Sequence, residues 1–84
     1  MTEQETRIAI ISIVVEDKDC VSRVNELLHE YGRHIIGRMG IPYPTKGVSL
    51  ISVAIDAPAD TISALTGKLG RIPGLTVKAA YSKA

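Results

Sequence analysis

The apolar residues of the first third of the chain change their spacing from dense to periodic. Residues 7–16 are rich in β-branched side chains, which predicts a strand. A polar, acidic turn at residues 17–19 suits a helix N-terminus. Apolar residues then recur three or four positions apart, at Val21, Val24, Leu28 and Tyr31. This spacing predicts an amphipathic helix, which Gly32 ends.

The rest of the chain adds two strands, a helix and a last strand. Residues 34–41 predict a strand weakened by two glycines, and residues 42–47 predict a loop because their prolines cannot donate to a strand ladder. A third strand is expected over residues 48–56 and a second helix over 57–70, with a proline near its start. Residues 75–81 predict the final strand.

The resulting order βαββαβ is typical of the α+β, ferredoxin-like arrangement, with a four-stranded antiparallel sheet and two helices on one face. A chain of 84 residues allows one domain. We therefore expect a flexible N-terminal lead-in at residues 1–6 and a single domain at residues 7–84. The chain has no apolar run of membrane-spanning length, and its acidic start is unlike a secretory signal, so we expect a cytoplasmic protein with no membrane partner.

Alternation along the strands assigns their odd positions to the helix-covered face. Met39 and Ile41 are expected there, and Arg38 on the opposite face. That opposite face also carries apolar residues at Ile8, Ile10, Ile36, Val48 and Leu50. Because so small a core is marginal, these residues predict an interface in a homo-oligomer, a dimer or tetramer. An edge-to-edge contact or a hydrated sheet is the alternative.

Composition and charge exclude several kinds of function. Ten basic residues balance nine acidic ones, so we expect no specific nucleic-acid binding by this chain alone. Cys20, His29 and His34 do not supply the four ligands of a closed zinc site, and we expect neither a metal nor a cofactor. No set of nucleophile, base and orienting group is evident, which argues against an enzyme. Cys20 is expected to be a structural thiol.

Three acidic residues, Glu16, Asp17 and Asp19, cluster where the first strand meets the first helix. Paired carboxylates can perform acid–base chemistry or bind a hard cation. They also suit a helix N-terminus, and that interpretation is favoured.

Four segments, at residues 14–17, 24–29, 38–40 and 60–70, resemble the small regulators of the iron-only hydrogenase system. The similarity covers about residues 7–79, and residues 60–70 are its most specific part. The resemblance implies an ACT-like form of the ferredoxin-like fold, similar to the effector domain of nickel-responsive repressors, and a regulatory role in an oligomer. The DNA-gripping arm and the metal histidines of those repressors have no counterpart in this sequence, so neither DNA binding nor nickel sensing is expected.

Two hypotheses for function follow. In the first, an oligomeric ACT-like domain senses a small-molecule effector, such as an amino acid or another anion, at a subunit interface near residues 16–20. Its candidate contacts are Asp17, Asn25, Arg38 and Gly40. In the second, the chain is a protein–protein assembly module without a small ligand, and it binds a hydrogenase-maturation protein through residues 41–47. Stabilisation by small ligands in a thermal-shift screen distinguishes the two.

Overall fold

A computed structural model gives the structure of residues 5–83. Four strands and two helices follow one another in the predicted order: β1 (Arg7–Val15), α1 (Val21–Glu30), β2 (Ile35–Tyr43), β3 (Val48–Ala57), α2 (Ala59–Gly70) and β4 (Leu75–Tyr81). Three short 3₁₀ turns join them: η1 (Lys18–Cys20), η2 (Gly32–His34) and η3 (Pro44–Lys46). Most of the expected lead-in, residues 1–4, lies outside the described residues, as does residue 84.

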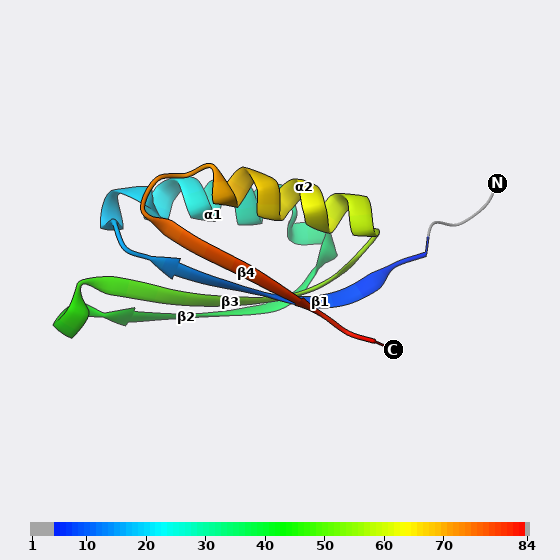
Figure 1. Ribbon diagram of the computed structural model, residues 1–84, viewed down its shortest axis with the longest axis horizontal. Helices are drawn as coiled ribbons and strands as arrows, with labels where there is room; N and C mark the ends of the chain where they lie inside the picture. The colour runs from blue at the N-terminus through cyan, green and yellow to red at the C-terminus, as the bar shows by residue number, and fades with distance from the viewer. Residues whose placement is uncertain (1–4, 84) are drawn as a thin grey trace.

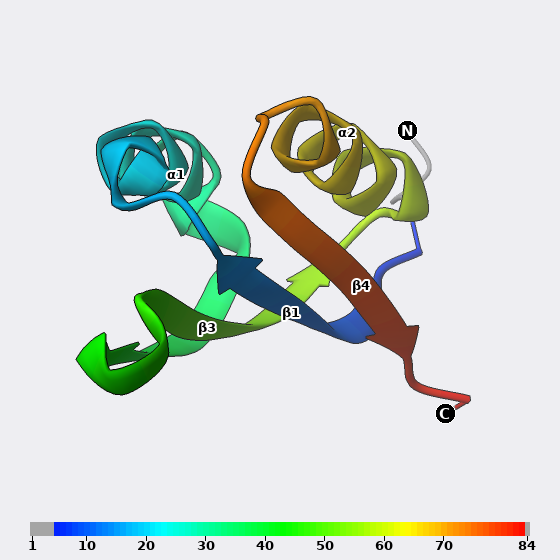
Figure 2. The same ribbon diagram turned by 60° about the vertical axis from the view of Figure 1, so that its left-hand side comes forward.

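The four strands form one sheet in the order β2-β3-β1-β4, and every neighbouring pair is antiparallel. Both helices lie on one face of this sheet, as Figure 1 shows from the side. Figure 2 shows α1 and α2 next to each other above the strands. The expected ferredoxin-like α+β fold is therefore confirmed. We call the helix-covered side of the sheet the inner face and the opposite side the outer face.

The core lies between the helices and the inner face of the two central strands. Odd positions from 9 to 15 of β1 and from 51 to 57 of β3 are buried there and meet the apolar stripes of both helices. The fully buried large side chains are Ile11, Ile13, Val15, Val24, Leu27, Leu28, Val53, Ile55, Ile62, Leu65 and Leu69. Burying such a side chain stabilises the fold by about 1.5–3 kcal/mol relative to its exposed state.

The predicted alternation was wrong along most of β2. Ile35 lies opposite Ile55, but Gly37 lies opposite Ala54, so Ile36 is an extra residue in a β-bulge. Because the side-chain period of a strand is two, one extra residue exchanges the faces of all that follow. Arg38 therefore lies on the inner face, and Met39 and Ile41 lie on the outer face.

The expected loop at residues 42–47 also begins too early. Pro42 and Tyr43 still pair with β3, opposite Ser49 and Val48. A proline is tolerated here because β2 is an edge strand, where an absent N–H costs no ladder bond on the open side.

The bulge enlarges the apolar surface of the outer face. Of the expected interface residues, Ile8, Ile10, Ile36 and Leu50 are exposed and Val48 is partly buried. The register adds Met39, Ile41 and Tyr43 to this side of the sheet. These exposed apolar residues are between 42% and 63% accessible. The outer face of the single chain is thus more apolar than the sequence pattern indicated.

Candidate functional site

Two adjoining hollows lie on the inner side of the β2–β3 hairpin. The first, which we call the Arg38 hollow, has a volume of about 230 Å³ and lies between α1 and the edge strand. It is lined by Val21, Asn25, Arg38, Gly40, Ile41, Pro42, Ser49 and Ile51. The second, the hairpin hollow, has a volume of about 260 Å³. It is lined by Val15, Lys18, Pro42, Tyr43, Pro44, Gly47, Val48 and Ser49.

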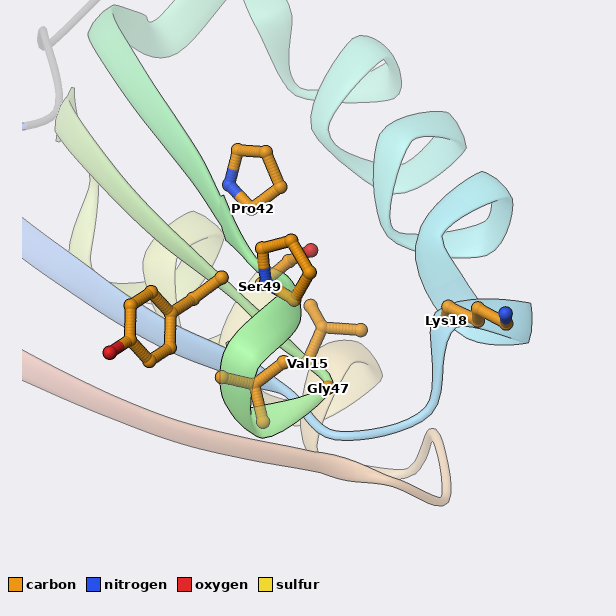
Figure 3. A pocket seen from close by; sticks show the side chains of 8 residues that line it. Val15, Lys18, Pro42, Gly47 and Ser49 are labelled. Atoms are coloured by element: carbon orange, nitrogen blue, oxygen red, sulfur yellow. The ribbon is translucent and has the colours of Figure 1, made fainter.

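Pro42 and Ser49 line both hollows, so the two form one path, which we call the edge groove. Figure 3 shows its hairpin end, with Lys18 on η1 across from Pro42, Ser49 and Gly47. One wall is the start of α1 with the turn before it, and the other is the hairpin.

Arg38 is the charged group of the edge groove. Its Nη2 donates a hydrogen bond to Oδ1 of Asn25 on α1, over 2.8 Å. The bulge makes this contact possible, because it turns Arg38 toward the helix side. Both ion pairs found among residues 5–83 involve other cations, Arg23 and Lys68, so no carboxylate neutralises the Arg38 guanidinium there. A guanidinium has five N–H donors, and the bond to Asn25 uses one of them.

Gly40 lies two residues beyond Arg38 on the same side of β2, opposite Ile51. A Cβ atom built on Gly40 would meet no other heavy atom within 4 Å. The glycine therefore leaves open space in the floor of the edge groove. Its φ is not positive, so its backbone conformation is one that other residues also adopt.

The structure brings together three of the four expected ligand contacts, Asn25, Arg38 and Gly40, and places Asp17 elsewhere. The side chain of Asp17 accepts a hydrogen bond from the backbone N–H of Asp19, over 3.0 Å, and caps η1. A Cβ atom on Gly74 would come within 2.8 Å of the Asp17 Cβ. Asp17 therefore packs closely against the turn between α2 and β4.

Glu16 also forms hydrogen bonds with β4 and with the turn before it. Its backbone N–H donates to the Gly74 carbonyl over 2.7 Å, and Thr76 Oγ1 donates to its Oε1 over 2.9 Å. The acidic residues at 16–19 thus fasten the turn after β1 to the turn before β4. The favoured interpretation of the acidic cluster was a helix N-terminus. Asp17 caps η1, which leads into α1, but the first turn of α1 itself holds no acidic residue.

Cys20 is held in a similar way. Its thiol donates to the Pro73 carbonyl over 2.9 Å, and the side chain packs against the core. Desolvation raises the pKa of the Cys20 thiol, and the nearby carboxylates of Asp17 and Asp19 raise this pKa further. A thiol with a raised pKa is a poor nucleophile near neutral pH.

Two further properties concern the described part of the chain as a whole. Its His, Cys, Asp and Glu side chains form no group of three or more that could hold a metal ion. Neither of its helices has the length and apolar character needed to cross a membrane.

Sequence reasoning missed Lys18, Ser49 and Val15 as groove residues, and it named Pro42 only within the partner-binding segment 41–47. The proline-rich segment was a usable signal, because it marked where the hairpin turns. The position of Ser49 and Val15 depends on the strand register, which brings them opposite each other across β1 and β3.

The fold and the groove define a class: a small ferredoxin-like α+β domain with an apolar outer sheet face and a cationic groove at one sheet edge. A family model described as "Iron-only hydrogenase system regulator, putative" matches residues 7–79. The chain belongs to this TM1266-like family, as the resemblance of its segments indicated. The family description is that of a regulator rather than of an enzyme.

One solved structure has the same fold and is that of the protein after which the family is named. The uncharacterized protein TM1266 from Thermotoga maritima superposes with a TM-score of 0.90 and is 39% identical in sequence. The match covers 94% of this chain and 100% of that one. None of the curated proteins matches the chain.

Proposed function

We propose that this protein is an oligomeric, ACT-like regulatory domain of the iron-only hydrogenase system, and that it senses a small anion bound in the Arg38 hollow. The observation that carries the proposal is the Arg38 guanidinium, which faces the hollow beside Asn25 with no carboxylate partner among residues 5–83. A positive charge at the mouth of a concave site attracts anions, and the planar guanidinium matches the oxygens of a carboxylate or phosphate.

Asn25 and Gly40 support the same chemistry. Asn25 uses its carbonyl oxygen to accept from Arg38, which leaves its NH₂ group free to donate to a bound anion. Gly40 lets a ligand approach the backbone of β2 closely, because it has no side chain. Asp17 takes no part in this site, since its carboxylate caps η1.

A thermal-shift screen of amino acids, simple carboxylates and phosphates tests the proposal. A ligand at about 100 times its dissociation constant adds about 2.7 kcal/mol to the free energy of unfolding, which is a visible shift in a small domain. Arg38→Gln should abolish the shift. Arg33→Gln, which removes an exposed arginine outside the groove, is the control and should leave the shift unchanged. A shift that persists in Arg38→Gln contradicts the proposed site.

The proposed oligomer places the outer face of one copy against the outer face of another. β1 and β2, with nine residues each, are about 30 Å long, and the four strands of the sheet span about 19 Å, which gives a flat area of roughly 600 Å². Stable interfaces bury about 800 Å² per partner, so the size is appropriate once side-chain relief is added. Ser12 and Ser52, paired with each other, are uncharged, while Lys78 beside Ser12 and Asp56 beside Ile8 place one charge of each sign on the same face. The apolar residues of this face can pack against the same residues of a second copy, as a two-fold contact requires.

Light scattering over micromolar concentrations tests the interface. Leu50→Glu should convert the oligomer to a 9.0 kDa monomer, because assembly would bury an unpaired carboxylate. Ser63→Glu adds the same charge to an exposed position of α2 and should leave assembly intact. If both variants assemble alike, the contact lies on another surface.

The assembly-module alternative keeps one specific observation in its favour. Ile41 and Tyr43 are about half exposed on a hairpin that, in Figure 1, extends past the end of the helical layer. If no anion shifts the melting temperature while Tyr43→Ser weakens binding to a hydrogenase-maturation protein, this alternative replaces anion sensing.

A further inference from the structure

We infer that the ligand of the edge groove is an amphiphilic anion, a monocarboxylate whose unbranched apolar chain lies along β2 from Arg38 into the hairpin hollow. The inference rests on the proposed function, because it takes the Arg38 hollow as the place of the charged end. It adds the chemical class of the remainder of the ligand, which the charge of Arg38 alone does not specify.

The first support is the continuity of the groove. Arg38, Gly40 and Pro42 are alternate residues of one strand on its inner side, and they line the groove in that order. A strand rises about 3.3 Å per residue, so the path from Arg38 to Pro42 is about 13 Å long. The hairpin hollow continues beyond Pro42. A compact anion such as acetate would occupy only the beginning of this path.

The second support is the change in chemistry along the path. Beyond Arg38 and Asn25 the walls are mainly apolar: Val21, Ile51, Pro42, Val15 and Pro44. No acidic side chain lines either hollow among the described residues. Lys18 stands at the far end, but Figure 3 shows its amine pointing away from the hairpin, so it offers its hydrocarbon stem. The groove therefore has one cationic end and one apolar end.

The third support is the empty space at Gly40, midway between these ends. Any larger residue at this position would project a side chain into the path of a bound chain, yet nothing in the structure occupies the space around its missing Cβ. Gly37 has equally open surroundings but lies on the outer face, opposite Ala54. The two glycines thus provide a blocking variant and a matched control in the same strand.

The experiment is an NMR titration of the full chain with straight-chain monocarboxylates from acetate to octanoate. Affinity should rise roughly two- to fourfold for each added methylene, the upper value being that of a fully buried methylene. Arg38→Gln should weaken every member of the series by a similar factor. Suberate, the dicarboxylate of octanoate's length, should bind more weakly than octanoate because its second charge would enter the apolar end.

Gly40→Val should reduce octanoate affinity at least tenfold while acetate affinity changes less than twofold, and Gly37→Val should change neither. An affinity that depends on Arg38 but not on chain length would overturn this inference and leave anion sensing intact. Absence of any Arg38-dependent binding would overturn both. Chain-length dependence that survives Gly40→Val, or suberate binding more tightly than octanoate, would place the chain elsewhere and also overturn it.

Discussion

β3 and β2 are neighbouring strands in one sheet, but their side chains have different surroundings. β3 alternates buried and accessible positions from Leu50 to its end, with Val53 and Ile55 fully enclosed. β2 is exposed at every position after Ile35. The difference arises because β3 pairs on both edges and lies beneath the helices, whereas β2 pairs on one edge only.

This contrast indicates that β3 serves mainly stability, whereas β2 carries the residues proposed for function. Residues of β3 contribute to the common core, so their identity is constrained by packing. Residues of β2 contribute little to that core and carry the proposed ligand contacts on one side and proposed interface residues on the other. Segments with few buried contacts are the ones that can change shape when a ligand or partner binds.

The same substitution in each strand gives the largest expected difference. Ile55→Ala should lower the free energy of unfolding by about 2–5 kcal/mol, because it leaves a cavity in a fully enclosed site. Ile41→Ala should cost less than about 1 kcal/mol in the monomer, since Ile41 is already 46% exposed. Urea denaturation of both variants measures the two values.

Repeating the urea denaturation at several protein concentrations makes this comparison more specific. If the outer face is an interface, the cost of Ile41→Ala should grow as concentration rises, because the wild type then gains stability from assembly. The cost of Ile55→Ala should depend much less on concentration. Equal costs for the two variants in the monomer would contradict the contrast between the strands.

A second pair of variants compares the turn of the β2–β3 hairpin with the turn before β4. Gly74 and Gly47 both have positive φ, 84° and 68°. Gly74→Ala should cost about 2–3 kcal/mol, because it adds a close contact with the Asp17 Cβ to the strain of a left-handed conformation. Gly47→Ala should cost about 1 kcal/mol, since its surroundings are open.

The difference between these two glycine variants isolates the contact with Asp17. Thermal unfolding followed by circular dichroism would measure it. If Gly47→Ala proves as costly as Gly74→Ala, the close packing of the two turns contributes nothing measurable to stability.

The smallest expected effect on stability belongs to the proposed site itself. Arg38→Gln should change the free energy of unfolding by no more than about 0.5 kcal/mol, because Arg38 is exposed and makes one hydrogen bond on the surface. Asn25→Ala should behave similarly. Equilibrium unfolding without ligand measures both variants, and a loss above about 2 kcal/mol would indicate that the pair is structural.

The pattern of apolar residues in the sequence was sufficient to predict the central part of this fold. Dense β-branched residues in β1 and β3, and apolar residues at helical spacing in α1 and α2, predicted the order of elements, and the odd strand positions predicted most of the core. β4 was predicted with its observed bounds, residues 75–81. These predictions succeeded because residue types that favour strands or helices cluster in each element, and because one face of each central strand is buried.

For β2, the sequence did not predict which residues face the helices. Its glycines, its proline and its apolar residues fit a strand in either orientation, and the extra residue at Ile36 leaves no mark in the sequence. The candidate site was therefore predicted only in part. Asn25, Arg38 and Gly40 were chosen, but Arg38 was assigned to the wrong face of the sheet. Asp17 was grouped with these residues, and the structure separates it from them.

The sequence by itself thus determined the fold class, the family and the buried faces of the central strands, because periodic apolar residues and local turn chemistry specify them. The tertiary structure alone decided which side of β2 meets α1, and therefore where the Arg38 charge lies. The physical reason is that a strand bulge is selected by pairing with β3 and by packing against the helix, and neither interaction is present in the local sequence.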